Sequence, residues 1–119
     1  MVQRTSQNEG IILNLCINYG SKQEIIYAVN SWLADQAGKS KELKLTEKKF
    51  EKYLFTYGFP EIDLLIRTGG EYRISNFLLW QIAYSEIIIM DVMWPDFGPI
   101  QLQEAVVEYN KRKRRFGGI

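Results

Sequence analysis

Stretches of apolar residues alternate along this chain with polar segments that contain glycine, and each stretch has a period that predicts its secondary structure. Residues 11–17 are apolar on both faces, which predicts a strand buried within a parallel sheet. Ser21 and Glu24 then match a capping box, which predicts a helix that ends near Gly38. Its predicted inner stripe consists of Ile25, Val29, Trp32 and Leu33.

The second half of the chain continues this alternation of helices and strands. The predicted elements are a helix capped by Thr46 and ended by Gly58, a strand over 62–67, a helix from Ser75 or Asn76 to about Tyr84, a strand over 87–90, and a helix over 100–115 whose inner face carries Leu102, Ala105, Val106 and Tyr109. The fold class predicted is α/β, a parallel sheet with flanking helices. Because three strands leave apolar edges uncovered, we expect further strands from outside this sequence or from a partner.

Composition narrows the function classes without selecting one. The chain has 119 residues, enough for one domain at most. Five of its fifteen basic side chains lie in 111–115, and a basic patch this short does not predict a nucleic-acid-binding protein. Histidine is absent, which excludes histidine-based acid–base catalysis and histidine metal sites.

The same composition bears on the compartment in which the chain works. The lone cysteine, Cys16, lies in the first apolar run and is expected to be a buried thiol in a reducing compartment. The amino-terminal residues have no apolar core typical of a secretory signal, and no apolar run is long enough to span a bilayer. We therefore expect a cytoplasmic protein, with any membrane contact peripheral and at the inner face.

The candidate chemistry lies after the strand over 62–67. Arg67 ends the strand, Gly69 and Gly70 turn the chain, and Arg73 and Ser75 lead into the next predicted helix. Arginine forks pair with phosphate oxygens, glycine lets backbone N–H groups approach, and a helix N-terminus adds unpaired donors. These features predict a site for a phosphorylated ligand. The alternative is a surface loop with an arginine–glutamate ion pair.

Several motifs together resemble the cis-prenyltransferases, specifically the undecaprenyl diphosphate synthases. They are D-L-L-I-R-T-G-G-E-x-R-I-S-N-F-L-L-W-Q from Asp63, then A-Y-S-E, D-V-x-W-P-D-F and the terminal R-R-F-G-G. The resemblance runs from about residue 4 to the end and implies that residues 1–119 are the C-terminal portion of a single cis-prenyltransferase domain. The family's catalytic aspartate belongs to a D-G-N-G-R-W-A segment that this sequence lacks. We therefore expect no catalytic residue from this chain, and negligible turnover by it alone.

The resemblance also implies roles for individual residues. Arg67, Arg73 and Ser75 would hold the diphosphate of isopentenyl diphosphate, and Glu86 would help to bind Mg²⁺. A salt-bridge partner at the end of a secondary-structure element is the alternative for Glu86. The residues expected to organise the loop are Asp63, Gly69, Gly70 and Glu71.

Other matching residues concern subunit contacts and turns. Arg115 and Gly117 would cross a homodimer to the partner's diphosphate site, whereas helix-end cations and a frayed tail are the alternative for 111–118. In the turn Asn18-Tyr19-Gly20, Ser21-Lys22 replaces the family's Gly-Arg, and we favour a purely structural turn there. The aromatic residues expected in the core or a subunit interface are Trp80, Tyr84, Trp94 and Phe97.

The function implied by the resemblance is prenyl chain elongation. Isopentenyl diphosphate would be added to an allylic diphosphate, expected to be farnesyl diphosphate, to give undecaprenyl diphosphate, a lipid carrier for cell-wall sugars. The alternatives are a non-catalytic subunit or interaction module of a cis-prenyltransferase complex, and a generic phosphate-binding α/β domain.

Overall fold

The computed structural model describes residues 2–39 and 43–112. Its elements in chain order are α1 (Val2–Thr5), α2 (Ser21–Gln36), α3 (Glu47–Phe50), the 3₁₀ helix η1 (Glu51–Tyr53), β1 (Leu64–Arg67), β2 (Glu86–Ile89), the 3₁₀ helix η2 (Trp94–Asp96) and α4 (Pro99–Lys111). The predicted strands at 62–67 and 87–90 and the predicted helices after Gly20, Thr46 and Gly98 are thus present, with shifted ends.

The two strands form a parallel sheet, as the apolar runs predict. Leu64 pairs with Glu86 and Arg67 pairs with Ile89, so the two strands end at the same edge. Parallel strands require a crossover connection, and residues 68–85 provide it here. Arg67 therefore leaves the sheet at its carboxyl edge, where α/β folds bind ligands.

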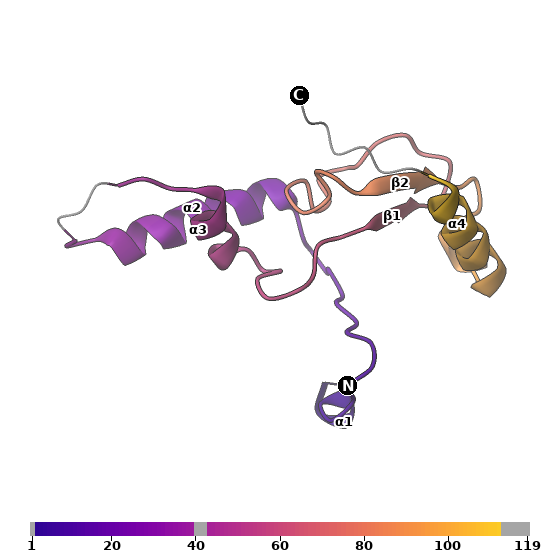
Figure 1. The fold of residues 1–119 in the computed structure, drawn as a ribbon, viewed down its shortest axis with the longest axis horizontal. Coiled ribbons are helices and arrows are strands. Elements are labelled where there is room, and N and C mark those ends of the chain that lie inside the picture. Colours follow the sequence, from indigo (N-terminus) through magenta and orange to yellow (C-terminus); the bar gives the residue numbers. More distant parts are fainter. Residues whose placement is uncertain (1, 40–42, 113–119) are drawn as a thin grey trace.

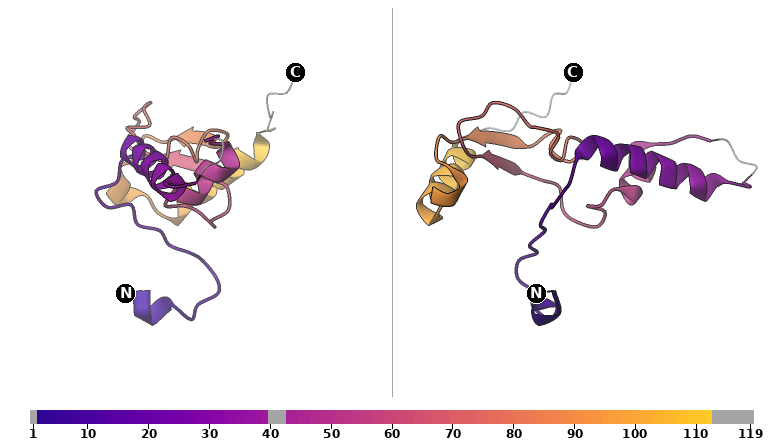
Figure 2. Two further views of the ribbon diagram at one scale, coloured as in Figure 1. Left: turned by 90° about the vertical axis from the view of Figure 1, so that its left-hand side faces the viewer. Right: turned by 180° about the vertical axis from the view of Figure 1, so that it is seen from behind.

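The helices lie on two sides of this sheet (Figure 1). Helices α2 and α3 pack together at one end, α4 packs beside β2 at the other, and the amino-terminal segment with α1 extends away from both, as the two views of Figure 2 also show. The radius of gyration is 17.7 Å. A compact chain of this length would have about 13.5 Å, so the described chain is extended, both by the projecting segment and by the placement of α2 and α4 at opposite ends of the sheet.

A small apolar cluster joins α2 to the residues of α3 and those that follow it. Ala28 of α2 packs on Phe50 and Leu54, which are all buried, and the partly buried residues around them are Ile25, Val29, Leu45 and Tyr53. Thr46 begins α3 as predicted, because its side-chain oxygen accepts a hydrogen bond from the Lys49 N–H at 3.4 Å. At the other end, Ala105 of α4 is buried, whereas the predicted inner-face residues Leu102 and Val106 are about half exposed, as is Leu33 of α2.

A buried carboxylate, Glu24, joins α2 to two other segments. Its side chain is 1% exposed and accepts hydrogen bonds from the Phe55 backbone N–H at 2.7 Å, from Gln81 Nε2 at 3.1 Å and from the Tyr19 hydroxyl. The Glu24 network consists of these four residues. The predicted capping box is therefore wrong: Gly20 is the N-cap, and Glu24 serves tertiary contacts instead of the helix end.

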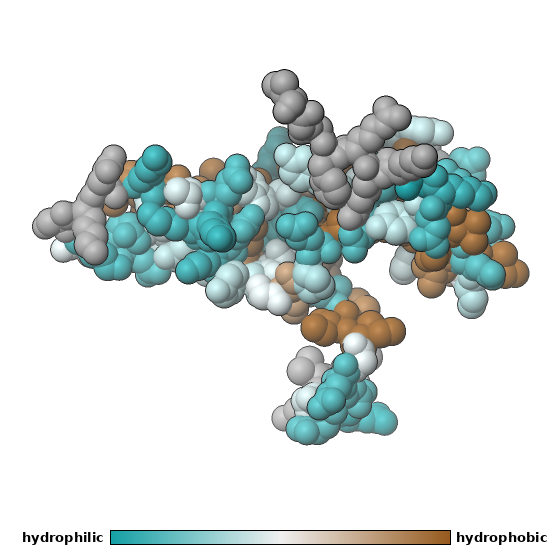
Figure 3. Space-filling model, in the orientation of Figure 1, coloured by the Kyte–Doolittle hydropathy of each residue, from teal (hydrophilic) through white to brown (hydrophobic). Residues whose placement is uncertain are grey.

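The predicted strand over 11–17 is not formed. Ile11 is 94% exposed and Ile17 is 84% exposed, and Cys16, expected to be buried, is exposed as well. Figure 3 shows this apolar surface in brown on the projecting segment. A strand needs neighbours for its backbone groups, and no other described strand pairs with this segment.

The predicted helix from Ser75 or Asn76 to Tyr84 is also wrong. Residues 75–84 form successive turns and bends, because Ser75, Asn76 and Leu78 have φ angles of 53°, 63° and 46°. Such left-handed residues cannot continue a right-handed helix. In the described part of the chain, none of the helices is long and apolar enough to cross a lipid bilayer.

Candidate functional site: the Arg67–Ser75 loop

Arg67 is the first residue of the site, and one of its hydrogen-bond donors lacks an acceptor. Its Nε atom is buried and has no hydrogen-bond partner among the residues described. Neither does any carboxylate within 2–39 or 43–112 form an ion pair with its guanidinium group. A buried guanidinium N–H without an acceptor is costly, so this geometry suits an anionic ligand at the carboxyl edge of the sheet.

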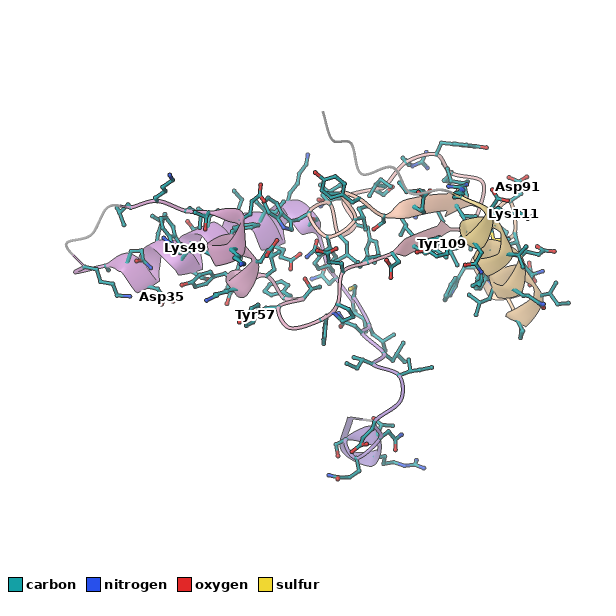
Figure 4. The ribbon with its side chains drawn as sticks, viewed as in Figure 1. Asp35, Lys49, Tyr57, Asp91, Tyr109 and Lys111 are labelled. Atoms are coloured by element: carbon teal, nitrogen blue, oxygen red, sulfur yellow. The ribbon has the colours of Figure 1, made fainter. Side chains whose placement is uncertain are left out.

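The glycine pair after Arg67 binds the neighbouring segment and not a ligand. The Gly69 N–H donates to the Val92 carbonyl at 2.9 Å, and the Gly70 N–H donates to the Met90 carbonyl at 3.0 Å. These two N–H groups are therefore already satisfied within the chain, and the expected role of the glycines as loop organisers stays a prediction. Both glycines have positive φ, and a Cβ added to Gly70 would lie 2.8 Å from Oδ1 of Asp91, which follows β2 and is labelled in Figure 4.

Arg73 and Ser75 follow on the exposed side of the loop. Arg73 forms an ion pair with Glu71 at 2.6 Å, and the side chains of these two residues are 67% and 42% exposed. An ion pair this exposed contributes less than about 1 kcal/mol to the free energy of folding, so a phosphate could displace Glu71 at little cost. The alternative named for this loop, an arginine–glutamate pair, is thus present.

Two other contributions differ from the sequence-based expectation. Residue 75 does not begin a helix, so the helix N-terminus expected there is not formed, and the donors beside the loop come from the first turn of α2 and bond Asn76. The predicted loop organiser Asp63 contributes through its backbone, since its carbonyl accepts the Glu86 N–H at 3.0 Å. The groups of this loop that suit an anion are therefore side chains, Arg67 and Arg73 in particular.

Glu86 lies away from these arginines. It pairs with Leu64 at the start of the strands, whereas Arg67 pairs with Ile89 at their end, which separates Glu86 from Arg67 by roughly 10 Å along the sheet. Arg112 Nη1 instead contacts Glu86 Oε2 at 3.1 Å and the Ile87 carbonyl at 2.9 Å. The hydrogen bond that Arg112 donates to Glu86 raises the pKa of Arg112 above its ordinary value.

These contacts bear on the expected Mg²⁺ site. Within the residues that the structure describes, no group of three or more acidic or cysteine side chains could hold a metal ion. Glu86 is a single carboxylate that Arg112 already neutralises, so these residues alone do not fit Mg²⁺. The salt bridge named as the alternative for Glu86 is present, and the expected Mg²⁺ role of this residue stays a prediction. Arg115 and Gly117, expected at a partner's site, lie outside the described residues.

The sequence-based prediction did not include the residues whose hydrogen bonds join this loop to α2. Ser21 and Asn76 join the start of α2 to the residues that follow Ser75. The one sequence feature that points to this contact is Ser21-Lys22 in place of Gly-Arg. The capping-box pattern predicts that Ser21 caps its own helix, whereas its hydroxyl accepts a hydrogen bond from the distant Leu79 N–H.

Comparison with known proteins assigns this chain to a family. Residues 1–117 match the family model described as "Putative undecaprenyl diphosphate synthase". An isoprenyl transferase from Oceanobacillus iheyensis is 50% identical over 99% of this chain and 47% of its own length. One from Fusobacterium nucleatum is 53% identical over 98% of this chain and 48% of its own length. The chain thus spans about half the length of the curated relatives it matches.

Solved structures agree with this assignment. Lavandulyl diphosphate synthase from Lavandula x intermedia, in complex with dimethylallyl diphosphate, superimposes with a TM-score of 0.89 at 35% identity, over 96% of this chain and 50% of that one. A probable undecaprenyl diphosphate synthase from Campylobacter jejuni gives a TM-score of 0.81 at 30% identity, over 98% of this chain and 52% of that one. The predicted family resemblance and fold class are confirmed.

Proposed function

Because the chain belongs to the undecaprenyl diphosphate synthase family of prenyltransferases, we propose that the Arg67–Ser75 loop binds the diphosphate group of isopentenyl diphosphate. The observation that carries the proposal is the buried Arg67 Nε, which lacks an acceptor at the carboxyl edge of the sheet. A diphosphate oxygen would supply that acceptor. Arg73 would then exchange Glu71 for a second phosphate oxygen, and the exposed Ser75 hydroxyl could donate a third hydrogen bond.

For the whole protein, we propose condensation of isopentenyl diphosphate with an allylic diphosphate, farnesyl diphosphate in the first instance. Repeated additions would give undecaprenyl diphosphate. In this chain the arginines orient the isopentenyl group by holding its diphosphate, which places the reacting double bond at a fixed distance from the loop. The catalytic aspartate would come from outside these residues, so turnover by the isolated chain would be negligible.

The proposal includes Mg²⁺ and a homodimer. Mg²⁺ commonly uses one or two carboxylates with phosphate oxygens and waters, so Glu86 would be this chain's ligand once further groups come from outside the described residues. Arg112 would have to release Glu86 for that to happen. We place the protein in the cytoplasm, with membrane contact only through its lipid product.

Calorimetric titration of the chain with isopentenyl diphosphate tests the proposed site. Replacing Arg67 with Ala should abolish or weaken binding by roughly a hundredfold, because two hydrogen bonds to a charged group are lost. Arg4→Ala, which removes an exposed arginine in α1, is the matched control and should bind like the wild type. Equal binding by the Arg67→Ala variant, or tighter binding of nucleotides than of isopentenyl diphosphate, would refute the proposed site.

A further inference from the structure

The residues after Arg73 have a backbone conformation that needs external support. Ser75, Asn76 and Leu78 all have positive φ, although none of them is glycine. Each such residue is unfavourable on its own and persists only where surrounding contacts impose it. Since Ser75 is one of these residues, the direction of its hydroxyl group depends on whatever holds this backbone in place.

The first turn of α2 supplies one side of that support. The Ser21 N–H donates to the Asn76 carbonyl at 2.8 Å, and the Lys22 N–H donates to Asn76 Oδ1 at 2.8 Å. These are the first two N–H groups of α2, which a helix cannot satisfy by itself. The N-cap residue Gly20 has no side chain to accept them. Asn76 therefore caps α2 from a distant part of the chain.

The loop receives support in return. Ser21 Oγ accepts a hydrogen bond from the Leu79 N–H at 2.9 Å, and Asn76 Nδ2 donates to Gln23 Oε1 at 3.1 Å. Ser21 is fully buried and Leu78 is 8% exposed, so water cannot readily replace the Ser21 hydroxyl. The α2 clamp consists of Ser21 and Asn76 together with these partners.

The clamp has little tolerance for displacement. A Cβ added to Gly20 would lie 2.8 Å from Asn76 Nδ2, so the α2 terminus and the loop are already in close contact. The helix end and the left-handed backbone thus satisfy each other's donors and acceptors. Neither would keep its conformation at this point without the other.

We propose that Ser21 and Asn76 are positioning residues for the diphosphate-binding loop, and that they act by holding Ser75 in its left-handed conformation. The inference rests on the proposed function, since it concerns the shape of the same site. Neither residue is assigned contact with the substrate.

The test combines binding with backbone amide exchange in the full chain. Ser21→Ala removes the acceptor for the Leu79 N–H, and Asn76→Ala removes the acceptor for the Lys22 N–H. Each should accelerate hydrogen exchange at the affected amide and weaken isopentenyl diphosphate binding by roughly tenfold, while the chain remains folded by circular dichroism. Asn76→Asp keeps the Oδ1 acceptor and tolerates positive φ, so it should retain affinity.

Asn30→Ala, an exposed substitution within α2, is the control and should change neither property. If Ser21→Ala and Asn76→Ala bind isopentenyl diphosphate as tightly as the wild type, the positioning role is refuted and the proposed function is not. This holds even if both variants have lower melting temperatures. Equal loss of affinity in Asn76→Asp and Asn76→Ala would also refute the positioning role, because the Oδ1 acceptor, which Asn76→Asp keeps and Asn76→Ala lacks, would then be irrelevant. No binding by the wild-type chain would refute the proposed function and the positioning role together.

Discussion

Replacement of Glu24 tests whether its buried carboxylate holds the fold together at the junction of three segments. Glu24→Leu keeps a side chain of similar size but leaves three donors without their acceptor: the Phe55 N–H, the Tyr19 hydroxyl and one N–H of Gln81 Nε2, whose other N–H still bonds Thr56 Oγ1. Each unmet donor costs about 1–3 kcal/mol, and burial of leucine returns about 2 kcal/mol. We expect the free energy of unfolding to fall by about 3–4 kcal/mol.

Glu24→Gln separates the loss of charge from the loss of acceptors. Gln81 Oε1 is buried without a partner among the described residues, so rotation of the Gln81 amide could let that oxygen accept a hydrogen bond from the new amide group. One oxygen would still accept the Phe55 N–H. We therefore expect Glu24→Gln to lower the free energy of unfolding by only about 1–2 kcal/mol, because charge-assisted bonds become neutral ones.

Urea unfolding followed by tryptophan fluorescence would measure these differences, since the Trp80 ring centroid lies 4.6 Å from that of Phe50 in the core. Glu104→Leu and Glu104→Gln are matched controls on the exposed face of α4 and should change the free energy of unfolding by less than about 0.5 kcal/mol. A Glu24→Leu variant as stable as its Glu104 control would refute the reasoning. Equal losses for Glu24→Leu and Glu24→Gln would refute the rotation of Gln81.

Two further predictions concern the glycine turn and the pH dependence of stability. In urea titrations, Gly70→Ala should lower the free energy of unfolding by at least about 1–2 kcal/mol more than Gly58→Ala does. Both sites have positive φ, but only at Gly70 would the new Cβ lie 2.8 Å from a carboxylate oxygen. Equal losses in the two variants would contradict this reasoning. Burial, together with a hydrogen bond to Glu24, raises the pKa of Tyr19 to about 12. The folded state then holds this proton more tightly than the unfolded state, so the stability it confers is present below pH 10 and is lost between pH 10 and 12. The stability difference between the wild type and Tyr19→Phe should narrow over that range, and a constant difference would exclude the effect.

The sequence predicts those parts of the fold that depend on local patterns. The apolar spacing and Thr46 locate α2 and α3, and the β-branched run at 87–90 locates β2. The apolar run at 11–17 predicts a buried environment without specifying which strands create it, and no strand within the described residues pairs with it. At Asn76, hydrogen bonds to a helix more than fifty residues away override the local preference for a helix.

The same distinction applies to the candidate site. Arg67, Arg73 and Ser75 are consecutive features of one strand and its loop, so spacing in the sequence predicts that they share a region. The role of Gly69 depends on which carbonyl groups of the neighbouring segment face it, and the position of Glu86 depends on the register of the two strands. Register and tertiary partners follow from the whole fold, and no local pattern encodes them.

The exposed segment over 11–17 bears on the solubility of this chain. Its sequence Ile-Ile-Leu-Asn-Leu-Cys-Ile has no charge, no proline and no glycine, which is the composition of segments that stack into cross-β fibrils. Copies of the chain can satisfy each other's backbone groups through it, and the exposed Cys16 thiols can then be oxidised to intermolecular disulfides. We therefore expect association through this segment to limit the concentration at which the chain can be handled, and reducing conditions to remove only the covalent part of that limit.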